Sequence, residues 1–448
     1  MRNTTTTGIA SSNCNRTAYF AQGNIMRLAM AVAATVLLHA LAPQGAAAQL
    51  NIERFARTDF NFTPPGARSM GIGGAFTAVA DDATAVESNP AGLTTLLYPE
   101  ASFELKYATV RTVVSEQAGG GPDGRAFNNG GLAPSFFSVV FPVGGLTLAA
   151  NYAKIVDTGG VLIGNGYEFS DGTHLYPWLS DMDWEVANIG VGVAKRFGTL
   201  SMGVSGGISR MSLMLSHTRY EVNTNQPAYV VNTATVSEAD GQKTAPYVNL
   251  GLINRFGRLS AGVTYKMRAR FEDVPVAYTN FRGVQFSAIN GRTPDTTFTV
   301  KLPDALSIGL ALQPTDRLTI SAAVDQTLYS QLAERVGVLV SFSTDLASNY
   351  TADDGIDLRG GAEWIVATGS VPLAVRAGVA SVAPANVYYT GSDQATQGLY
   401  GDEAGERGIE FSGGFGGVLF NRIQFDVAGV AGNQRKELIT SFVLRRNQ

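Results

Sequence analysis

The sequence predicts an all-β fold: a transmembrane antiparallel β-barrel of about 14 strands. Three observations indicate this fold. Only 16% of the 448 residues are charged, against about 25% in ordinary soluble proteins, although the hydrophobic content of 45% is average. Apolar and polar residues alternate along many short segments. Short and long links between these segments also alternate along the chain, as they do in bacterial outer-membrane barrels.

Residues 1–48 are predicted to be a signal peptide that is cleaved on export. Arg27 precedes an apolar run over 28–41, and Ala46-Ala47-Ala48 offers a small-residue cleavage site. The apolar run is shorter than the roughly 20 residues that a membrane-spanning helix needs. Met26 alone would begin a complete signal, so translation is expected to start effectively at Met1 or at Met26. The mature chain then begins at Gln49.

The exported chain is expected to be mildly acidic and free of cysteine. The single cysteine, Cys14, lies in the leader, and without the leader's three arginines the chain has 30 basic and 37 acidic residues. This negative balance makes nucleic acid an unlikely partner class, so none is predicted. No metal-ligand spacing and no nucleotide-binding pattern is present, because the glycines of GIGGAF lack the third member of that motif. No cofactor and no metal are predicted.

Alternation with a period of two identifies the strands. Over 146–152, Leu146, Leu148 and Tyr152 share one face, and Thr147 and Asn151 share the other. The segments 318–325, 356–364 and 423–427 show the same pattern. Fourteen strands are predicted to begin near Ser102, Ser135, Leu146, Asp183, Leu200, Ala245, Leu259, Asp304, Leu318, Gly355, Val371, Arg407, Arg422 and Lys436.

The links between these strands predict which end of the barrel faces which compartment. Short links, expected to be periplasmic turns, are 144–145, 197–200, 256–259, 313–317, 367–371 and 420–422. Longer polar links, expected to be extracellular, are about 120–133, 157–182, 217–244, 272–300, 330–354 and 384–406, with a shorter one at 431–435. The run 334–343 is assigned to a loop, although it could be another strand. The alternative fold, a secreted β-sandwich, would carry more surface charge.

The segment GARSMGIGGAFTAVADDATAVESNPAGL, residues 66–93, resembles the N-terminal region of the long-chain fatty acid transporter family of outer-membrane barrels (FadL, OMPP1 and TodX). The matching core is Gly73-Gly74-Ala75, Asp81-Asp82-Ala83 and the run from Asn89 to Leu93. The resemblance continues over 302–325 and, more weakly, over 359–364 and the C-terminal strands.

This resemblance implies a barrel over 99–448 whose lumen is plugged by a small hatch domain, residues 49–98. It implies a hatch or gate motif of Asp81, Asp82, Asn89, Pro90, Ala91 and Gly92. Asp81 and Asp82 are expected to cap a short helix that begins near Ala83. Asn89 is expected to shape a turn before Pro90 by bonding to nearby backbone. The alternative is that the motif folds the plug and binds nothing.

Two groups of residues are candidate cargo sites. The link over 157–182 is unusually apolar, which suggests a hydrophobic collecting surface, or else a loop packed on its neighbours; its candidates are Leu162, Tyr167, Phe169, Tyr176, Trp178 and Leu179. An arginine fork matches a carboxylate head group. The candidate anchors facing the lumen are Arg359, Arg376, Arg196 and Arg255.

The resemblance implies transport of long-chain fatty acids or similar hydrophobic molecules across the outer membrane of a Gram-negative type of envelope. Cargo would bind at the loops, enter the lumen and pass a movable hatch, leaving sideways near the third strand in some members. Membrane lipid and the cargo are the expected partners, and the protein is expected to be a monomer. The alternative function is a scaffold or attachment partner of a secretion system. No enzyme is predicted, because His174 and His217 lie in no catalytic spacing.

Overall fold

A computed structural model describes residues 65–114, 125–164, 167–168, 174–175, 178–223, 230–280, 296–332, 350–367, 371–385, 388–392, 405–420, 422–432 and 435–446. The signal peptide and residues 49–64 lie outside the described residues, as does the run 334–343. No helix in the described part is long and apolar enough to cross a membrane.

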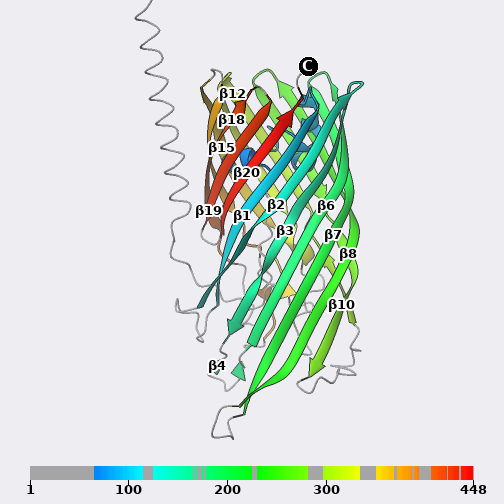
Figure 1. The fold of residues 1–448 in the computed structure, drawn as a ribbon, viewed down its shortest axis with the longest axis vertical. Coiled ribbons are helices and arrows are strands. Elements are labelled where there is room, and N and C mark those ends of the chain that lie inside the picture. The colour runs from blue at the N-terminus through cyan, green and yellow to red at the C-terminus, as the bar shows by residue number, and fades with distance from the viewer. Residues whose placement is uncertain are drawn as a thin grey trace, which may run out of the picture.

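In the described residues, fourteen antiparallel strands close into a barrel (Figure 1). The ring closes where β1 pairs with β20, and β8 pairs with β9. The fourteen strands are β1 (Glu100–Val114), β2 (Arg125–Val143), β3 (Leu146–Gly164), β6 (Trp178–Phe197), β7 (Leu200–Asn223), β8 (Val230–Phe256), β9 (Leu259–Met267), β12 (Ala305–Thr315), β13 (Leu318–Thr327), β15 (Gly355–Ala367), β16 (Leu373–Val382), β18 (Gly408–Leu419), β19 (Ile423–Gly432) and β20 (Arg435–Arg445).

Several strands continue far beyond the bilayer, as the lower half of Figure 1 shows for β7, β8 and β10. β7 has 24 residues and β8 has 27, whereas about 9–11 residues span a membrane. β10 (Arg270–Asn280) pairs with the outer part of β8, and β11 (Thr296–Lys301) pairs with β10. Short strand pairs β4 (Tyr167–Glu168) with β5 (His174–Leu175), and β14 (Tyr350–Thr351) with β17 (Tyr388–Tyr389), lie among the links at this end.

The predicted strand starts are confirmed where a strand leaves a short turn, but three starts at the opposite end are wrong. β2, β6 and β8 begin well before Ser135, Asp183 and Ala245. The links predicted over 120–133, 157–182, 217–244 and 272–300 are therefore partly strand. The error has a physical cause: outside the membrane a strand has no lipid-facing side, so the alternation that identified the strands is lost there.

Short turns join the strands at one end of the barrel, at the glycines where the sequence predicted them. Gly144 and Gly145 have φ of 58° and 80°, and Gly198 and Gly257 have φ near 60°. Two-residue turns of this kind match the twist of the flanking strands and favour glycine. Because outer-membrane barrels have short turns on the periplasmic side, this end, at the top of Figure 1, is the periplasmic end.

Because apolar and polar residues alternate along each strand, the outer surface of the barrel is apolar and its inner surface is polar. On β13, Ile320 and Val324 are each 46% exposed to the outside, whereas Ser321 is 4% exposed. The outward residues form the surface that contacts lipid. The inward residues leave a lumen lined by hydroxyl, amide and charged groups, which a plug must satisfy.

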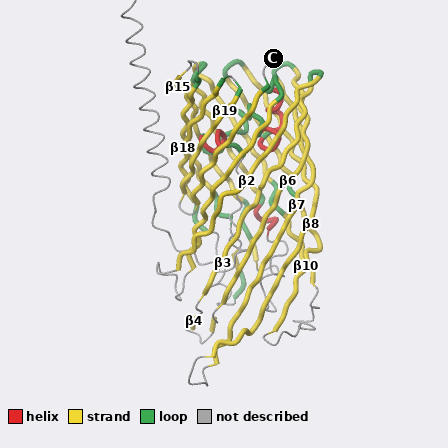
Figure 2. Tube along the Cα trace, viewed as in Figure 1, coloured by secondary structure: helices red, strands yellow, loops and turns green. Residues whose placement is uncertain are grey.

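Residues 65–98, here called the lumen segment, lie inside this ring of strands. The segment contains three short helices, α2 (Ala67–Gly71), α3 (Ala85–Ser88) and the 3₁₀-helix η2 (Pro90–Thr95), which Figure 2 shows within the wall. A further 3₁₀-helix, η3 (Tyr329–Leu332), follows β13. Most apolar side chains of the lumen segment are buried, and those of Phe76 and Leu93 are fully so, whereas Leu97 at its end is exposed.

Three pairs of glycines on the inner wall allow the backbone of the lumen segment to touch the barrel. Each pair sits at one register position of two neighbouring strands: Gly203 with Gly251, Gly262 with Gly309, and Gly361 with Gly378. A Cβ atom on Gly203 would stand 2.3 Å from the carbonyl carbon of Pro90, and one on Gly361 would stand 2.3 Å from the carbonyl oxygen of Ile72. Any side chain there would displace the lumen segment.

We expect Gly361→Ala to loosen the lumen segment, because the added methyl group overlaps the backbone at Ile72. The expected loss of stability is about 1–3 kcal/mol, measured as a lower unfolding temperature, together with a higher ion conductance in planar bilayers. Gly360→Ala is the matched control, since a Cβ atom there faces outward and meets no atom closer than 4.0 Å. Equal effects of the two substitutions would refute the close fit at Gly361.

Candidate functional site

Asn89 holds the sharp turn between α3 and η2. Its extended backbone (φ −151°, ψ 102°) suits a residue before proline, and its Oδ1 accepts a hydrogen bond from the backbone N–H of Ala91 at 3.2 Å. Its Nδ2 donates to the carbonyl of Thr77 at 2.8 Å and lies 3.3 Å from that of Leu252 on β8. Asn89 therefore bonds to nearby backbone as expected, and it also ties η2 to the barrel wall.

The two aspartates of the motif have different roles. Asp82 accepts the backbone N–H of Thr84 at 2.9 Å through Oδ1, ahead of a helix that begins at Ala85 rather than near Ala83. Asp81 does not cap this helix; its carboxylate pairs with Arg68 of α2. The capping prediction is thus wrong for both aspartates: the helix begins two residues later than expected, Thr84 is its N-cap residue, and no side chain caps it.

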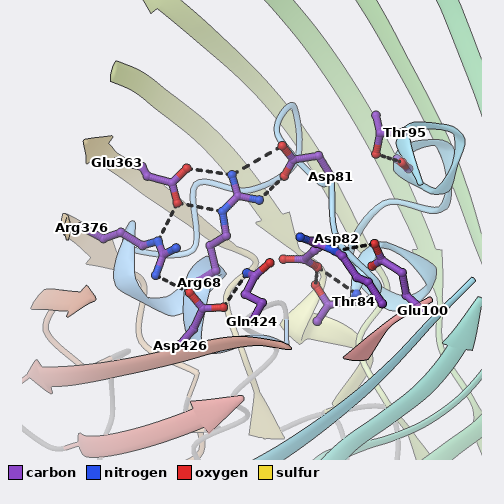
Figure 3. Close-up of polar contacts among 12 residues, drawn as sticks. Arg68, Asp81, Asp82, Thr84, Thr95, Glu100, Glu363, Arg376, Gln424 and Asp426 are labelled. Atoms are coloured by element: carbon purple, nitrogen blue, oxygen red, sulfur yellow. Dashed lines mark hydrogen bonds and ion pairs between the residues drawn. The ribbon is translucent and has the colours of Figure 1, made fainter. Parts of the chain in front are cut away.

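Arg68 connects the lumen segment to the far wall of the barrel (Figure 3). Its Nε and Nη2 each donate to a carboxylate oxygen of Glu363 on β15 at 2.8 Å, and its Nη1 bonds to Asp81. Arg376 of β16, which faces Glu363 in the strand register, donates from Nε to the same carboxylate at 2.6 Å and pairs with Asp426 of β19 at 2.7 Å. Two arginines and three carboxylates thus form one chain of ion pairs, buried at Arg376 and Asp426 and partly exposed at Asp81.

Arg359 belongs to a second cluster on the same wall. Its Nε donates to Asp325 of β13 at 2.6 Å and its Nη2 to Asp357 at 2.7 Å, while its Nη1 lies 3.5 Å from the carbonyl of Gly73. Arg359 and Arg376 lie on adjacent strands, as expected, but the register opposes Arg359 to Ala380. Both guanidinium groups are occupied by carboxylates of the chain in this state, so their role as cargo anchors stays a prediction.

The other two candidate anchors lie near the periplasmic end. Arg196 is exposed and its Nη2 donates to the carbonyl of Thr94 at 3.2 Å. Among the described residues, Nη1 of Arg255 is buried without a hydrogen-bond partner. Contact of either residue with cargo likewise stays a prediction.

A small cavity, here called the charged pocket, lies between the lumen segment and the inner wall. Its volume is about 40 Å³, and Pro65, Met70 and Glu87 form its side on the lumen segment. The wall contributes charged residues that the sequence analysis did not single out: Lys106, Lys154, Lys266, Arg268, Glu104 and Glu437. Alternation alone predicts that each of these faces inward, but only the strand register brings residues of β1, β3, β9 and β20 to one place.

Among the described residues, two cations of the charged pocket have only distant ion-pair partners. Nζ of Lys106 lies 3.7 Å from Glu437, and Nζ of Lys266 lies 4.0 Å from Glu87, both beyond hydrogen-bond distance. Lys154, in contrast, is held at 2.9 Å by Glu185 and at 3.2 Å by Asp157. Lys106 and Lys266 are therefore better placed than Lys154 to bond to an added anion.

The pairing of β2 and β3 ends beside this pocket. Their ladder runs from Val143–Leu146 to Phe136–Ala153 within the described residues; beyond it, β2 pairs with β1 alone and β3 with β6 alone. Pro134 has no N–H to continue the ladder, and β3 has a register shift between Lys154 and Val156. Ser135, Ala153, Lys154 and Ile155, which flank the end of the ladder, also line the charged pocket.

The predicted hydrophobic loop is shorter than expected. Leu162 lies in β3, Tyr167 in β4, and Trp178 and Leu179 in β6, while Phe169 and Tyr176 lie outside the described residues. Of the two histidines that follow the predicted leader, His217 lies in β7 rather than in a loop, and His174 lies in β5. In the described residues, no group of three or more histidine, cysteine, aspartate or glutamate side chains could hold a metal.

Burial shifts the pKa of charged groups in the lumen segment. The pKa values of Asp82 and Glu87 are raised because burial disfavours the charged carboxylate, in spite of opposing charges from Arg68 and Lys266, respectively. For Arg68, burial would lower the pKa, but Asp81 and Glu363 outweigh it and raise the pKa well above its ordinary value. Arg68 therefore stays charged, whereas Asp82 and Glu87 hold protons more tightly than exposed carboxyls do.

We expect Asp82→Asn to change how stability depends on pH. Because the folded-state pKa of Asp82 is raised above 3.8, its contribution is fully present below that value and is lost as the pH rises through the folded-state pKa. Asparagine keeps the Oδ1 acceptor for Thr84 without the charge. The unfolding temperature of Asp82→Asn relative to the parent should therefore increase from about pH 4 to about pH 7, each unit of pKa shift being worth about 1.4 kcal/mol.

Unfolding temperatures in detergent micelles at the two pH values test this expectation. Asp316→Asn is the control, because Asp316 lies in a turn with a side chain that is 94% exposed. If the Asp82→Asn and Asp316→Asn proteins shift equally with pH, burial of Asp82 is not the cause.

Comparisons with known proteins agree with this architecture. A FadL homologue of Pseudomonas aeruginosa superposes with a TM-score of 0.57 at 16% identity, covering 85% of this chain and 97% of that one. The toluene transporter TbuX of Ralstonia pickettii gives 0.58 at 16% identity (87% and 100%), and the toluene transporter TodX of P. putida gives 0.56 at 12% identity (87% and 100%). At these identities the likeness shows the fold.

A search of curated proteins finds no match. The model of the family described as outer membrane protein transport protein (OMPP1/FadL/TodX), however, matches residues 61–385. The match covers more than half of the chain, including the lumen segment and the strands from β1 to β16. The resemblance seen in residues 66–93 is thereby confirmed, and the chain belongs to the OMPP1/FadL/TodX family of outer-membrane transport proteins.

Proposed function

We propose that this protein carries long-chain fatty acids, or similar molecules with an acidic head group, across the outer membrane. The cargo head group binds in the charged pocket, and the cargo leaves sideways between β2 and β3. The observation that carries this proposal is the position of the pocket: residues that flank the end of the β2–β3 ladder also line it. Cargo bound there would lie beside an unpaired part of the wall.

The charges of the pocket favour an acidic cargo over a neutral hydrocarbon. A neutral molecule would desolvate four cations and three carboxylates without bonding to any of them, which costs free energy. A carboxylate could instead accept hydrogen bonds from Lys106 and Lys266, whose present partners are 3.7 Å and 4.0 Å away. The acyl chain would lie against apolar surface, gaining about 0.8 kcal/mol per buried methylene.

The size of the pocket favours a gate. A volume of about 40 Å³ exceeds the roughly 10–15 Å³ that a cavity needs to hold one water molecule, so the pocket has room for a small polar head group, whereas an acyl chain needs more space. Passage of a whole molecule then needs movement of the lumen segment, which we propose acts as the hatch. The motif from Asp81 to Gly92 would hold its closed position. The protein would act as a monomer, with the surrounding membrane lipid receiving the cargo, and as a channel rather than an enzyme.

A cross-link between β2 and β3 tests the sideways route. Ser135→Cys and Lys154→Cys place thiols at the next positions beyond Phe136–Ala153, and the mature chain is predicted to have no other cysteine. We expect uptake of labelled oleate by cells that carry this variant to fall at least several-fold after treatment with a short bifunctional thiol reagent. Uptake that is equal before and after cross-linking would exclude this exit.

The matched control joins the same strands where they are already paired. Val139→Cys and Ala150→Cys are register partners on the outward face, so their cross-link should leave uptake unchanged. A co-purification experiment with the tagged parent protein separates transport from the scaffold alternative. Retained lipid supports transport, and a stably bound secretion protein without lipid supports the scaffold.

A single substitution tests the acidic head group. Lys106→Gln should weaken oleate binding roughly ten- to a hundredfold, as expected for a lost hydrogen bond to a charged group. In this variant Glu437 still has a cation nearby, because Nε of Arg435 lies 3.8 Å from its Oε1, so the substitution does not leave this carboxylate without an ion-pair partner. Binding of toluene should not change, and neither should oleate binding by Lys195→Gln, whose side chain lies on an exposed position. Toluene binding without oleate binding would show that the cargo is a neutral aromatic.

A further inference from the structure

Glu87 of α3 is a buried carboxylate with weak partners. Asn188 of β6 donates from Nδ2 to its Oε1 at 3.4 Å, and Nζ of Lys266 on β9 lies 4.0 Å from the same oxygen. The amide of Asn249 on β8 also favours the charged carboxylate. The other oxygen of Glu87, Oε2, is buried and has no hydrogen-bond partner in the described part of the chain. Because burial without hydrogen bonds costs free energy, this arrangement stabilises the charge of Glu87 poorly.

The charged pocket places Glu87 beside the position proposed for the cargo head group. Glu87 and Lys266 line the same cavity, so a head group bonded to Lys266 would also lie beside Glu87. Within the described ranges, α3 packs on β3 and on η2, and η2 has no titratable side chain. The other titratable groups that face Glu87 or line the cavity are Lys106, Lys154, Arg268, Tyr247, Glu104 and Glu437. Of the three carboxylates in this set, that of Glu87 lies on the lumen segment rather than on the wall.

Two carboxylates beside one ammonium group compete for it. Like charges a few ångströms apart disfavour the ionised form, so in a shared site one of the two groups binds a proton. A cargo carboxylate that bonds to Lys266 takes this cation from Glu87 and adds a negative charge next to it. Burial already raises the pKa of Glu87, so Glu87 is the carboxylate that becomes neutral.

We propose that Glu87 is the internal competitor of the cargo head group for Lys266, and that each cargo anion binds together with one proton, which Glu87 takes up from water. This inference rests on the proposed function and adds a condition to it: the affinity for cargo falls as the pH rises. With Glu87 neutral, the ion pair between α3 and β9 is lost, whereas Arg68 still joins α2 to Glu363. Cargo binding thus weakens the hold on α3 and leaves that on α2 in place.

Isothermal titration calorimetry of the mature protein in a mild detergent, with oleate as the ligand, tests the proposal. Titrations in two buffers of different ionisation enthalpy give the number of protons taken up for each oleate bound. The parent protein should take up close to one proton, and its affinity should fall by up to about tenfold per pH unit between about pH 6 and about pH 8. Glu87→Gln should take up none and should bind oleate on the order of tenfold more tightly than the parent at about pH 8.

Two further variants serve as controls. Glu87→Asp keeps a carboxylate at this position and should keep the proton uptake. Glu185→Gln removes a carboxylate partner from another lysine of the pocket, Lys154, which retains Asp157 at 3.2 Å. Because Glu185 does not line the charged pocket, this variant should take up the same proton as the parent when it binds oleate.

The outcomes separate this proposal from the proposed function. Oleate binding by the parent without proton uptake would overturn the role of Glu87, and so would equal proton uptake by the parent and Glu87→Gln. Both results leave the proposed function standing, because oleate still binds. If the parent binds no oleate, the head-group site itself is refuted, and the role of Glu87 with it. The parent measurement needs no variant, so it decides even if Glu87→Gln does not fold.

Discussion

The structure depends on how closely the lumen segment approaches the inner wall. A barrel of fourteen strands has a fixed width, and a folded segment fits inside it only where the wall has no side chains in the way. The pairs Gly203–Gly251, Gly262–Gly309 and Gly361–Gly378 provide three such places on separate parts of the wall. Wall hydroxyls then bond to the segment's carbonyls, as Ser205 does to Val86 at 2.6 Å. Its backbone groups are thereby satisfied without a sheet.

In addition to this close fit, ion pairs with the wall determine how the lumen segment is oriented in the barrel. Arg68 joins Glu363 and Asp81, and Arg376 extends the chain to Asp426, so one rotation of the lumen segment satisfies all five groups. Removing one partner of a buried pair typically costs about 3–5 kcal/mol, because the other charge is left unpaired. A segment held in this way has one well-defined position in the lumen. The charged pocket beside it, with its longer distances at Lys106 and Lys266, is the less saturated part of the lumen.

Alternation predicted the barrel because lipid on one side and a polar lumen on the other impose it residue by residue. The short turns could also be predicted from adjacent residues alone. Gly144 and Gly198 lie in such turns and so identified the periplasmic end. The strand extensions beyond Asp183 and Ala245 could not be predicted, since water surrounds both faces there. Arg359 and Arg376 were rightly expected to face inward, but their partners follow from strand register, which opposes Arg376 to Glu363. The charged pocket combines five strands and the lumen segment, so no local pattern indicates it.

The lumen segment precedes all the barrel strands in the sequence, but part of its packing surface lies on the last two strands. Ala67 and Met70 of α2 pack against Ala428, Val430 and Ile439 on the two strands that end the chain, whereas Pro90 and Ala91 rest on Gly203 and Gly251 in the middle of the barrel. The lumen segment therefore precedes every strand of the wall that it packs on, and its contact surface is complete only after the final hairpin has joined β1.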